Sequence, residues 1–203
     1  MNPAMNTSRP ALPEAAFDQL FRQAHTAHAF QDAPLSTEVL HALYDSMKWA
    51  PTAFNAQPAR FVFVQSAHSK SQLAEALMPG NVPQVHSASV TVIVAYDTEF
   101  QAHLPSQFPA YDAKPLFDNN PALTESTAFR NSSMQGAYLM LAARAMGLDV
   151  GAMSGFDADK VNQTFFPDGR YRVNFLINLG VADPKGIYPR GPRLPFDSVA
   201  TIV

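Results

Sequence analysis

The chain has 203 residues, a formal net charge of −3 and no cysteine, and 47% of its residues are apolar whereas only 15% are charged. Without cysteine, disulfides, thiolate catalysis and cysteine-based zinc sites are excluded, and the small negative charge gives no electrostatic reason to expect nucleic acid or an anionic membrane as a partner. The length fits one domain. No apolar run approaches the ~18 residues of a membrane span, and the N-terminus lacks the basic and apolar regions of a signal peptide. We expect a cytoplasmic protein, with which the absence of cysteine is compatible.

The apolar periodicity predicts an α+β domain over residues 15–203, after a lead-in over residues 1–14. The predicted elements, in chain order, are a helix over 15–24, a helix from the N-cap Ser36 to Pro51, a strand over 61–65, a helix over 69–77, a strand over 89–96, a long helix over 124–146, a short helix capped by Asp157 and a strand over 172–181. The last two strands are nearly continuous apolar runs, which is typical of strands covered on both faces. We therefore expect helices to cover a small central sheet.

The long helix and the connections add three expectations. The apolar face of the long helix is predicted to consist of Met134, Ala137, Tyr138, Leu141, Ala142 and Ala145. Gly147 ends this helix, and the segment from Gly147 to Gly151 is interpreted as an ordinary turn. Residues 97–122 contain aromatic residues and prolines without periodicity, which we interpret as a lid or binding excursion. Residues 183–203 are too rich in proline for a helix and end apolar, so we expect an arm that lies over a partner subunit.

Uncharged polar side chains gather where elements end. Thr52, Asn55 and Gln57 lie in the stretch WAPTAFNAQPARFVF, between two prolines that interrupt the chain before a strand. The further clusters are Asn81 with Gln84, Ser154 with Gly155 in AMSGFD, and the arginines Arg190 and Arg193 in the arm. Neutral donors and acceptors suit the edge of a heteroaromatic ring or a ribose-like chain, and arginines suit phosphate. The residues alone thus favour a nucleotide-like cofactor, with capping of turns by Asn, Ser and Thr as the alternative.

No pattern for a metal or for acid–base catalysis accompanies these clusters. His25 and His28 are three residues apart, but no third ligand follows them, and the sequence contains no HExxH. The GxSxG motif, the P-loop and the GxGxxG fingerprint are also absent. We expect no metal site.

The motifs, taken in order, resemble those of the FMN-dependent nitroreductase family. The family pattern R-x-S-x-(K/R)-x-F corresponds to AHTAHAF at residues 24–30, and P-S-x-x-N-x-Q-P corresponds to PTAFNAQP at residues 51–58. NVPQ at 81–84, the helix end AMGLD with the turn AMSGFD, and RGPRLP before the C-terminus complete the set. Within the family, MKWAPT, TESTAFRNSSMQ and MSGFD are most similar to the branch that contains the malonic semialdehyde reductase of pyrimidine utilisation.

This resemblance implies a small, mainly antiparallel central sheet flanked by helices, with an extended C-terminal arm, in a homodimer whose long helices pack together and whose flavin binds at the interface. It implies that His25, Thr26 and His28 contact the ribityl-phosphate and pyrimidine parts of FMN. Arg193, aided by Arg190, would bind the phosphate.

The resemblance also implies roles for the neutral clusters. Asn55 would bond near the isoalloxazine, with Thr52 and Gln57 supporting the loop. Asn81 and Gln84 would reach the ribityl chain and the N1/C2 edge, and the backbone of Ser154 and Gly155 would face N5 and O4.

The sequence departs from the family pattern at charged positions. Ala24 replaces the usual arginine, so that phosphate binding must rely on Arg190, Arg193 and His25. His28 and Gln84 stand where many members carry lysine. Because less positive charge near N1/C2 stabilises an anionic reduced flavin less, we expect a lower reduction potential or weaker FMN retention.

The implied activity is a two-step hydride transfer through flavin N5, from NADH or NADPH to an acceptor. The branch implies malonic semialdehyde as the acceptor and 3-hydroxypropanoate as the product. Arg130, with Asn131 beside it, is the candidate for binding the substrate carboxylate, and the alternative is an ordinary solvated helix arginine. The alternatives for the whole protein are a broad nitroaromatic or quinone reductase, the activity of family branches that use reduced FMN with oxygen to fragment the flavin or that dehalogenate tyrosines, and a non-catalytic flavin-binding or purely structural dimer.

Overall fold

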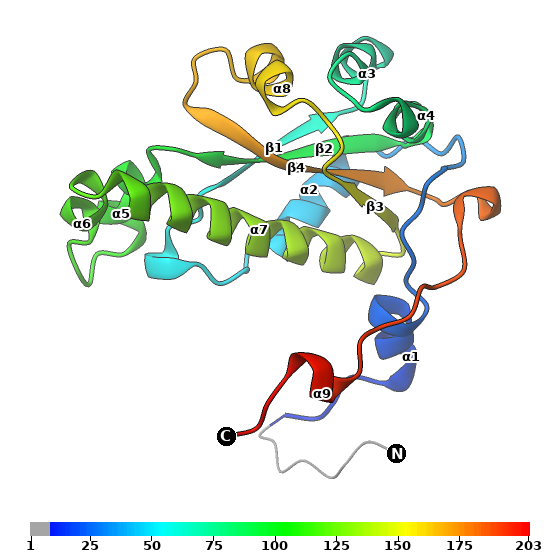
Figure 1. The fold of residues 1–203 in the computed structure, drawn as a ribbon, viewed down its shortest axis with the longest axis horizontal. Helices are drawn as coiled ribbons and strands as arrows, with labels where there is room; N and C mark the ends of the chain where they lie inside the picture. Colours follow the sequence, from blue (N-terminus) through cyan, green and yellow to red (C-terminus); the bar gives the residue numbers. More distant parts are fainter. Residues whose placement is uncertain (1–8) are drawn as a thin grey trace.

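A computed structural model describes residues 9–203, so most of the predicted lead-in lies outside the described residues. A central sheet lies between two layers of helices, and α1 and α9, near the two ends of the described chain, lie together at one corner of the molecule (Figure 1). The helices are α1 Glu14–Phe17, α2 Thr37–Met47, α3 Ala67–Ala74, α4 Val82–Ser87, α5 Leu104–Gln107, α6 Lys114–Asp118, α7 Pro121–Ala145, α8 Ala158–Phe165 and α9 Phe196–Val199. A π-helical turn, Asp18–Arg22, continues α1, and short 3₁₀ turns lie at Ala53–Asn55, Pro79–Asn81, Phe100–His103 and Pro184–Gly186.

The sheet has four strands, all antiparallel, in the order β1-β2-β4-β3. The strands are β1 Ala59–Val64, β2 Val90–Asp97, β3 Asp149–Met153 and β4 Tyr171–Gly180. Every residue of β2 is buried, as its unbroken apolar sequence predicts. The predicted α+β fold with a small antiparallel sheet is confirmed, and so are the N-caps Ser36 and Asp157, whose side chains accept hydrogen bonds from Val39 N and Lys160 N.

Strand β3 corrects the expectation that the segment from Gly147 to Gly151 is only a turn. Gly147 does end α7, with φ of +81°, but the chain then pairs with β4 from Asp149 onward. Gly151 stands where a Cβ atom would overlap the backbone oxygen of Ala27. This glycine therefore lets the segment around Ala27 cross close to the sheet edge, where Thr26 bridges Val150.

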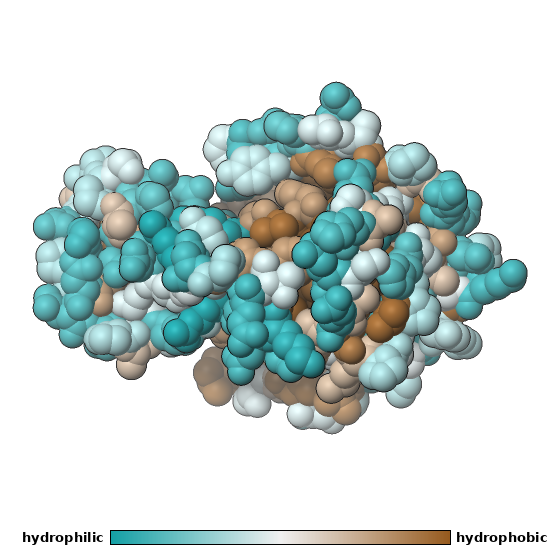
Figure 2. Space-filling view, turned by 90° about the horizontal axis from the view of Figure 1, so that it is seen from above, coloured by the Kyte–Doolittle hydropathy of each residue, from teal (hydrophilic) through white to brown (hydrophobic). Residues whose placement is uncertain are grey.

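Each face of the sheet has its own core. On one face α2 and α7 pack Leu43, Met47 and Leu139 against Val92 and Ile177. On the other, α3, α4 and α8 pack a separate apolar cluster made of Leu73, Val85, Val161, Ile93 and Leu176. The face formed by α3, α4 and α8 shows apolar side chains gathered near its middle between hydrophilic surfaces (Figure 2). Among residues 9–203, no helix is long and apolar enough to cross a membrane.

Helix α7 buries only part of the side that its sequence suggests, because Ala142 packs against the core whereas other residues of that side do not. Met134 and Tyr138 of the predicted apolar face are exposed, at 37% and 40%. The side chains turned toward the sheet and β1 are largely polar and include Thr127, Asn131 and Gln135. Asn131 and Gln135 accept hydrogen bonds from the backbone N–H groups of Ala53 and Ala59. Polar side chains of α7 thus hold the loop before β1, Leu139 and Ala142 pack in the core, and Met134 and Tyr138 are left uncovered in one chain.

Residues 97–122 and the arm over residues 183–203, for which no helix was predicted, both contain short helices. Residues 97–122 include α5 and α6, and a small core of Phe100, Leu104 and Phe117 packs them beside Phe54. The arm after Asp183 is extended, but its end forms α9, contrary to the expectation that proline excludes a helix there. Pro195 stands at the N-cap of α9, a position where the missing N–H of proline costs little.

Candidate functional site

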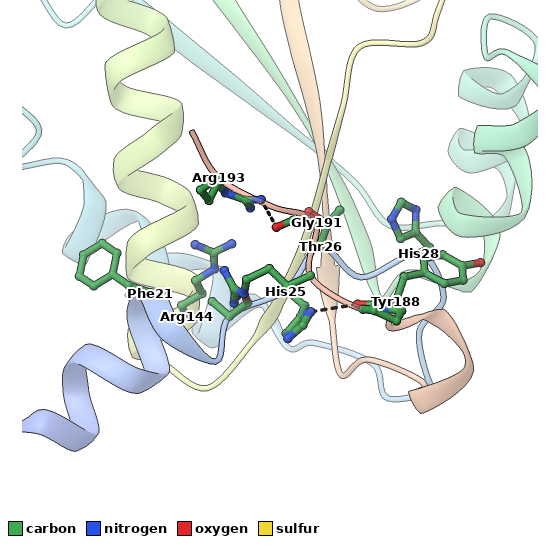
Figure 3. A pocket seen from close by; sticks show the side chains of 11 residues that line it. Phe21, His25, Thr26, His28, Arg144, Tyr188, Gly191 and Arg193 are labelled. Atoms are coloured by element: carbon green, nitrogen blue, oxygen red, sulfur yellow. Dashed lines mark hydrogen bonds between the residues drawn. The ribbon is translucent and has the colours of Figure 1, made fainter. Parts of the chain in front are cut away.

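A cavity of about 380 Å³ lies where α7 ends (Figure 3). Four segments line it: Phe21 of the π-helical turn, the chain over residues 24–28, the end of α7, and the arm over residues 188–193. Backbone bridges fix the segment over residues 24–28, because Thr26 pairs with Val150 of β3 and Ala27 pairs with Ile187 of the arm. His25, Thr26, His28, Arg190 and Arg193, predicted from separate motifs, all line this one cavity.

Arginines dominate the cavity, and a third one joins the two that were predicted. Arg190 donates to the carbonyl oxygens of Arg22 and Ala24 at 2.7 and 2.6 Å, and Arg193 donates to those of Gly191 and Pro192. Arg144, in the last turn of α7, lies in the same cavity. Within residues 9–203, no carboxylate lies within ion-pair distance of Arg144, Arg190 or Arg193.

Burial of Arg144 lowers its pKa below the ordinary value, and the charge of Arg190 lowers it further, while Asp149 acts in the opposite direction. A guanidinium remains protonated at any physiological pH. The downward shift therefore reports a cation placed beside another cation and partly out of water. Such a group is stabilised by an anion, and the fork of a guanidinium matches phosphate oxygens.

An aromatic–imidazole pair forms the other side of the cavity. The rings of His28 and Tyr188 lie 5.1 Å apart, and His25 Nδ1 lies 3.2 Å from the carbonyl oxygen of Tyr188 (Figure 3). Tyr188 is 59% exposed, so the pair borders solvent. The cavity thus borders solvent, is basic at the end of α7 and is aromatic at His28 and Tyr188.

A second group of predicted residues, Asn81, Gln84 and Gly155, comes together just after the end of β3. Asn81 Nδ2 donates to the carbonyl oxygen of Gly155 at 2.8 Å, and Gln84 Nε2 donates to Asn81 Oδ1 at 2.6 Å. A Cβ atom on Gly155 would stand 2.6 Å from Asn81 Nδ2, so glycine is required for this approach. Ser154 beside it is exposed. The two clusters that the sequence presents 70 residues apart form one neutral, hydrogen-bonded unit.

The loop with Thr52, Asn55 and Gln57 is rigid and strained. Phe54, Asn55 and Gln57 have φ between +44° and +50°, a region that costs about 1 kcal/mol or more for a non-glycine residue. Thr52 Oγ1 accepts from Gln57 N, and Gln57 Nε2 donates to Asn55 Oδ1. Such conformations persist where surrounding contacts impose them, and they cluster at functional sites.

Neighbouring elements impose this conformation. Asn131 of α7 accepts from Ala53 N, and Gln107 of α5 contacts both amides, through its backbone oxygen with Asn55 and its side-chain oxygen with Gln57. The ring of Phe54 packs against Phe108, Tyr111 and Phe117. Residues 97–122 therefore support the loop.

Within one chain the loop and the basic cavity are far apart. Asn131 holds the loop and Arg144 lines the cavity, and their separation of 13 positions along α7 corresponds to about 20 Å at a rise of about 1.5 Å per residue. The structure therefore brings the predicted site residues together in two places: the loop at one end of α7, and the cavity and the Asn81 cluster toward the other.

The two predicted substrate residues have different surroundings. Arg130 is exposed on α7. Asn131 is only 4% exposed, and its amide is already occupied by Ala53 N and the carbonyl oxygen of Thr127. In this arrangement the side chain of Asn131 supports the loop.

Sequence reasoning missed three contributors to these sites: Arg144, Tyr188 and Gln107. None of them lies in a recognisable motif. Only the position of Arg144 in the last turn before the helix stop Gly147 could have drawn attention, because a cation there is favoured by the helix dipole. No cluster of three His, Asp or Glu side chains suited to a metal occurs in the part of the chain that the structure describes.

The sequence model described as "Nitroreductase family" matches residues 21–181. The chain belongs to this family. It is 50% identical to a protein of Ralstonia nicotianae named "Putative NADH dehydrogenase/NAD(P)H nitroreductase", over 96% of this chain and 100% of that one. A Burkholderia lata protein of the same descriptive name is 54% identical over 94% of this chain and 98% of its own.

Solved structures of the nitroreductase family show the same fold. The crystal structure of a nitroreductase-like protein from Exiguobacterium sibiricum, titled a complex with FMN, superposes with a TM-score of 0.84 at 23% identity, covering 97% of this chain and 100% of that one. At this identity the likeness establishes the fold. The predicted family and its fold are both confirmed.

Proposed function

We propose that this nitroreductase family member is an FMN-dependent NAD(P)H oxidoreductase. The observation that carries the proposal is the cavity in which Arg144, Arg190 and Arg193 stand without a carboxylate partner among residues 9–203. A separate neutral cluster of Asn81, Gln84 and Gly155 adds to it. A flavin mononucleotide has both kinds of group, an anionic phosphate and an uncharged ring edge rich in donors and acceptors. The donor set therefore fits FMN, and the relative crystallised with FMN supports the same assignment.

Each part of the site has a distinct task. Arg190 and Arg193, with His25 and Thr26, bind the phosphate end. Asn81 and Gln84 bind the ribityl chain and the ring edge, and the backbone at Ser154 and Gly155 contacts the reactive side of the ring. When bound, FMN would supply the hydride chemistry that links NADH or NADPH to an acceptor. The protein binds and orients the ring, which explains why no acid–base pair accompanies these residues.

A second copy of the chain completes the site in this proposal. Thr52, Asn55 and Gln57 lie about 20 Å from the cavity along α7, too far to contact the same flavin from within one chain. The uncovered apolar side of α7 and the exposed Leu194, Phe196, Val199 and Ile202 of the arm supply a surface for a partner. In the homodimer the loop of one copy faces the cavity of the other. The loop's fixed conformation then presents Asn55 to the ring without an ordering cost.

Malonic semialdehyde is the proposed acceptor: its aldehyde carbon takes the hydride and its oxygen takes a proton from water or a side chain, which gives 3-hydroxypropanoate as the product. Arg130 is exposed and available for its carboxylate. The competing acceptors are nitroaromatics, in keeping with the names of the relatives, and quinones. A cytoplasmic location, with which the absence of cysteine is compatible, stays a prediction.

The purified protein tests the proposal directly. We expect a flavin absorbance spectrum that NADH or NADPH bleaches under anaerobic conditions. A protein that binds no added FMN would refute the proposal, and a flavin that neither nucleotide bleaches would indicate the non-catalytic binding dimer. Reoxidation by malonic semialdehyde, a nitroaromatic and a quinone, compared as kcat/KM, then identifies the acceptor.

Replacing Arg130 tests the proposed contact with the carboxylate. Arg130→Ala should raise KM for malonic semialdehyde about tenfold, because a charge-assisted hydrogen bond contributes roughly 1.5 kcal/mol, and should leave KM for a neutral quinone unchanged. Arg172→Ala, which removes an exposed arginine from β4, is the matched control. Equal effects of Arg130→Ala on both acceptors would remove Arg130 from the substrate site.

A further inference from the structure

The family motif at residues 24–30 normally begins with an arginine, and this chain has Ala24 there. Ala24 lines the basic cavity, and its carbonyl oxygen accepts a hydrogen bond from Arg190. An alanine side chain supplies neither charge nor donor, so this chain needs another cation to offset the charge of a phosphate at that point. His25, the next residue, has its Nδ1 directed at the carbonyl oxygen of Tyr188.

Arg144 provides a cation in the same space. It reaches the cavity from the last turn of α7, and it extends toward the same space as Arg193 of the arm (Figure 3). Arg144 Nη1 makes only a long hydrogen bond of 3.4 Å, to the carbonyl oxygen of Leu20. Most of its five N–H donors are thus left for a ligand.

The backbone that carries Arg144 is fixed in place. Gln19 Nε2 donates to the carbonyl oxygens of Arg144 and Ala145, which caps the end of α7. Gly147 with φ of +81° then turns the chain away toward β3. The guanidinium is held beside a second cation, Arg190, before any anion arrives, an arrangement that is useful for binding an anion and unfavourable without one.

We propose that Arg144 binds the phosphate of FMN in place of the arginine that Ala24 lacks, so that α7 and the arm bind the phosphate between them. This inference rests on the proposed function, because it assumes that FMN occupies the cavity. It adds a residue outside every motif, and it makes the end of α7 part of the cofactor site.

Comparing the Kd for FMN with the Kd for riboflavin isolates the contribution of the phosphate, because riboflavin has the same ring and ribityl chain but no phosphate. In Arg144→Gln we expect the Kd for FMN to rise about tenfold or more, because one charge-assisted contact is lost, and the Kd for riboflavin to stay within about twofold of wild type. Inorganic phosphate should raise the melting temperature of the flavin-free wild type and should raise that of Arg144→Gln less. Lys160→Gln, which removes an exposed cation from α8, should change none of these quantities.

A rescue variant tests the replacement itself. Adding Ala24→Arg to Arg144→Gln should restore most of the lost FMN affinity, and Arg144→Lys should retain part of it because the charge remains without the guanidinium fork. Normal FMN binding by Arg144→Gln would overturn the inference, and so would an equal loss of FMN and riboflavin or a failure of the rescue. If the wild type binds neither flavin, the proposed function fails instead, and a phosphate-dependent melting temperature that requires Arg144 would still support an anion site.

Discussion

The charged side chains of this protein fall into two groups, those that pair with a residue of opposite charge and those that do not. Asp97 is fully buried and accepts hydrogen bonds from Arg60, Arg170 and the backbone N–H of Glu99. It joins the ends of β1, β2 and β4, so its role is structural. Arg144 and Arg190 have no such carboxylate partner within residues 9–203, and we assign them to a ligand. The residue types alone do not separate these cases, because the sequence does not tell which charges meet.

Asp97 should make the fold sensitive to acid. Burial alone would raise the pKa of Asp97, but the hydrogen bonds from Arg170 and Glu99 N and the charges of Arg60 and Arg170 lower it below its ordinary value. A lowered folded-state pKa contributes stability above the unfolded-state pKa of about 4, and that contribution is lost as the pH falls through the folded-state pKa. Asp97→Asn should therefore reduce the free energy of unfolding by about 2–3 kcal/mol at pH 7 and by less at pH 3.

Urea unfolding of the flavin-free protein at pH 7 and pH 3 measures this difference. Asp118→Asn is the control, because Asp118 forms a surface ion pair with Lys114 on α6 and should matter by less than about 0.5 kcal/mol. A gap between wild type and Asp97→Asn that stays constant with pH would contradict the prediction.

Gly155 should matter for the cofactor more than for the fold. In Gly155→Ala the new methyl group would meet Asn81 Nδ2 at 2.6 Å and Met78 Sδ at 3.3 Å, both near the ends of side chains that can move. We expect unfolding to be affected by less than about 1 kcal/mol. The Kd for FMN should rise about two- to tenfold, because Asn81 loses its position at the ring edge.

Fluorescence titration with FMN checks this expectation. Gly80→Ala is a close control, since a Cβ atom at Gly80 has no neighbour within 4 Å. Equal Kd values for Gly155→Ala and wild type would remove the Asn81–Gly155 unit from the proposed site.

At the scale of elements, the sequence predicted the features that depend on local patterns, such as helix starts and buried strands. It did not predict which distant segments contact each other. The helix starts at Ser36 and Asp157 and the buried strands β2 and β4 depend on short-range signals, and all were predicted. Strand β3 was missed because its five residues, DVGAM, are a strand through pairing with the distant β4 and Thr26, and Gly151 is there for the close approach of Ala27. The neutral clusters were predicted as residues, but only the fold shows that Asn81 and Gly155 meet.

Helix α7 illustrates the same limit, because its polar side supports the loop before β1. In Asn131→Ala the backbone N–H of Ala53 and the carbonyl oxygen of Thr127 lose their partner. An unsatisfied buried donor costs about 1–3 kcal/mol, which is the expected loss in the free energy of unfolding. Ser126→Ala on the exposed side of α7 should be neutral or slightly stabilising, because alanine is a better helix former. Denaturant unfolding compares the two, and equal stabilities would show that the loop holds without Asn131.

At the scale of the whole molecule, the composition and the structure point to the same conclusion. Only 15% of the residues are charged, and the exposed apolar side chains gather on α7 and on the arm, including Met134, Tyr138, Leu194 and Phe196. A dimer that buries these surfaces would also bring the strained loop of one copy to the cavity of the other. The proposed assembly thus explains three features that one chain leaves separate: the low charge, the uncovered helix side and the divided site.

Placing a charge on the uncovered side of α7 tests whether the assembly and the cofactor site depend on each other. Tyr138 is 40% exposed in one chain, so Tyr138→Glu should fold normally and, by burying an unpaired carboxylate at the interface, should shift the protein toward monomer. Because Asn55 of the partner is then lost from the site, FMN retention should fall with dimer content. Leu116→Glu on α6 introduces the same charge at a side chain of similar exposure, 45%, and should remain dimeric and loaded with FMN. Sedimentation equilibrium with the flavin absorbance of each species measures both quantities, and a Tyr138→Glu monomer that retains FMN as tightly as wild type would show that one chain binds the flavin alone.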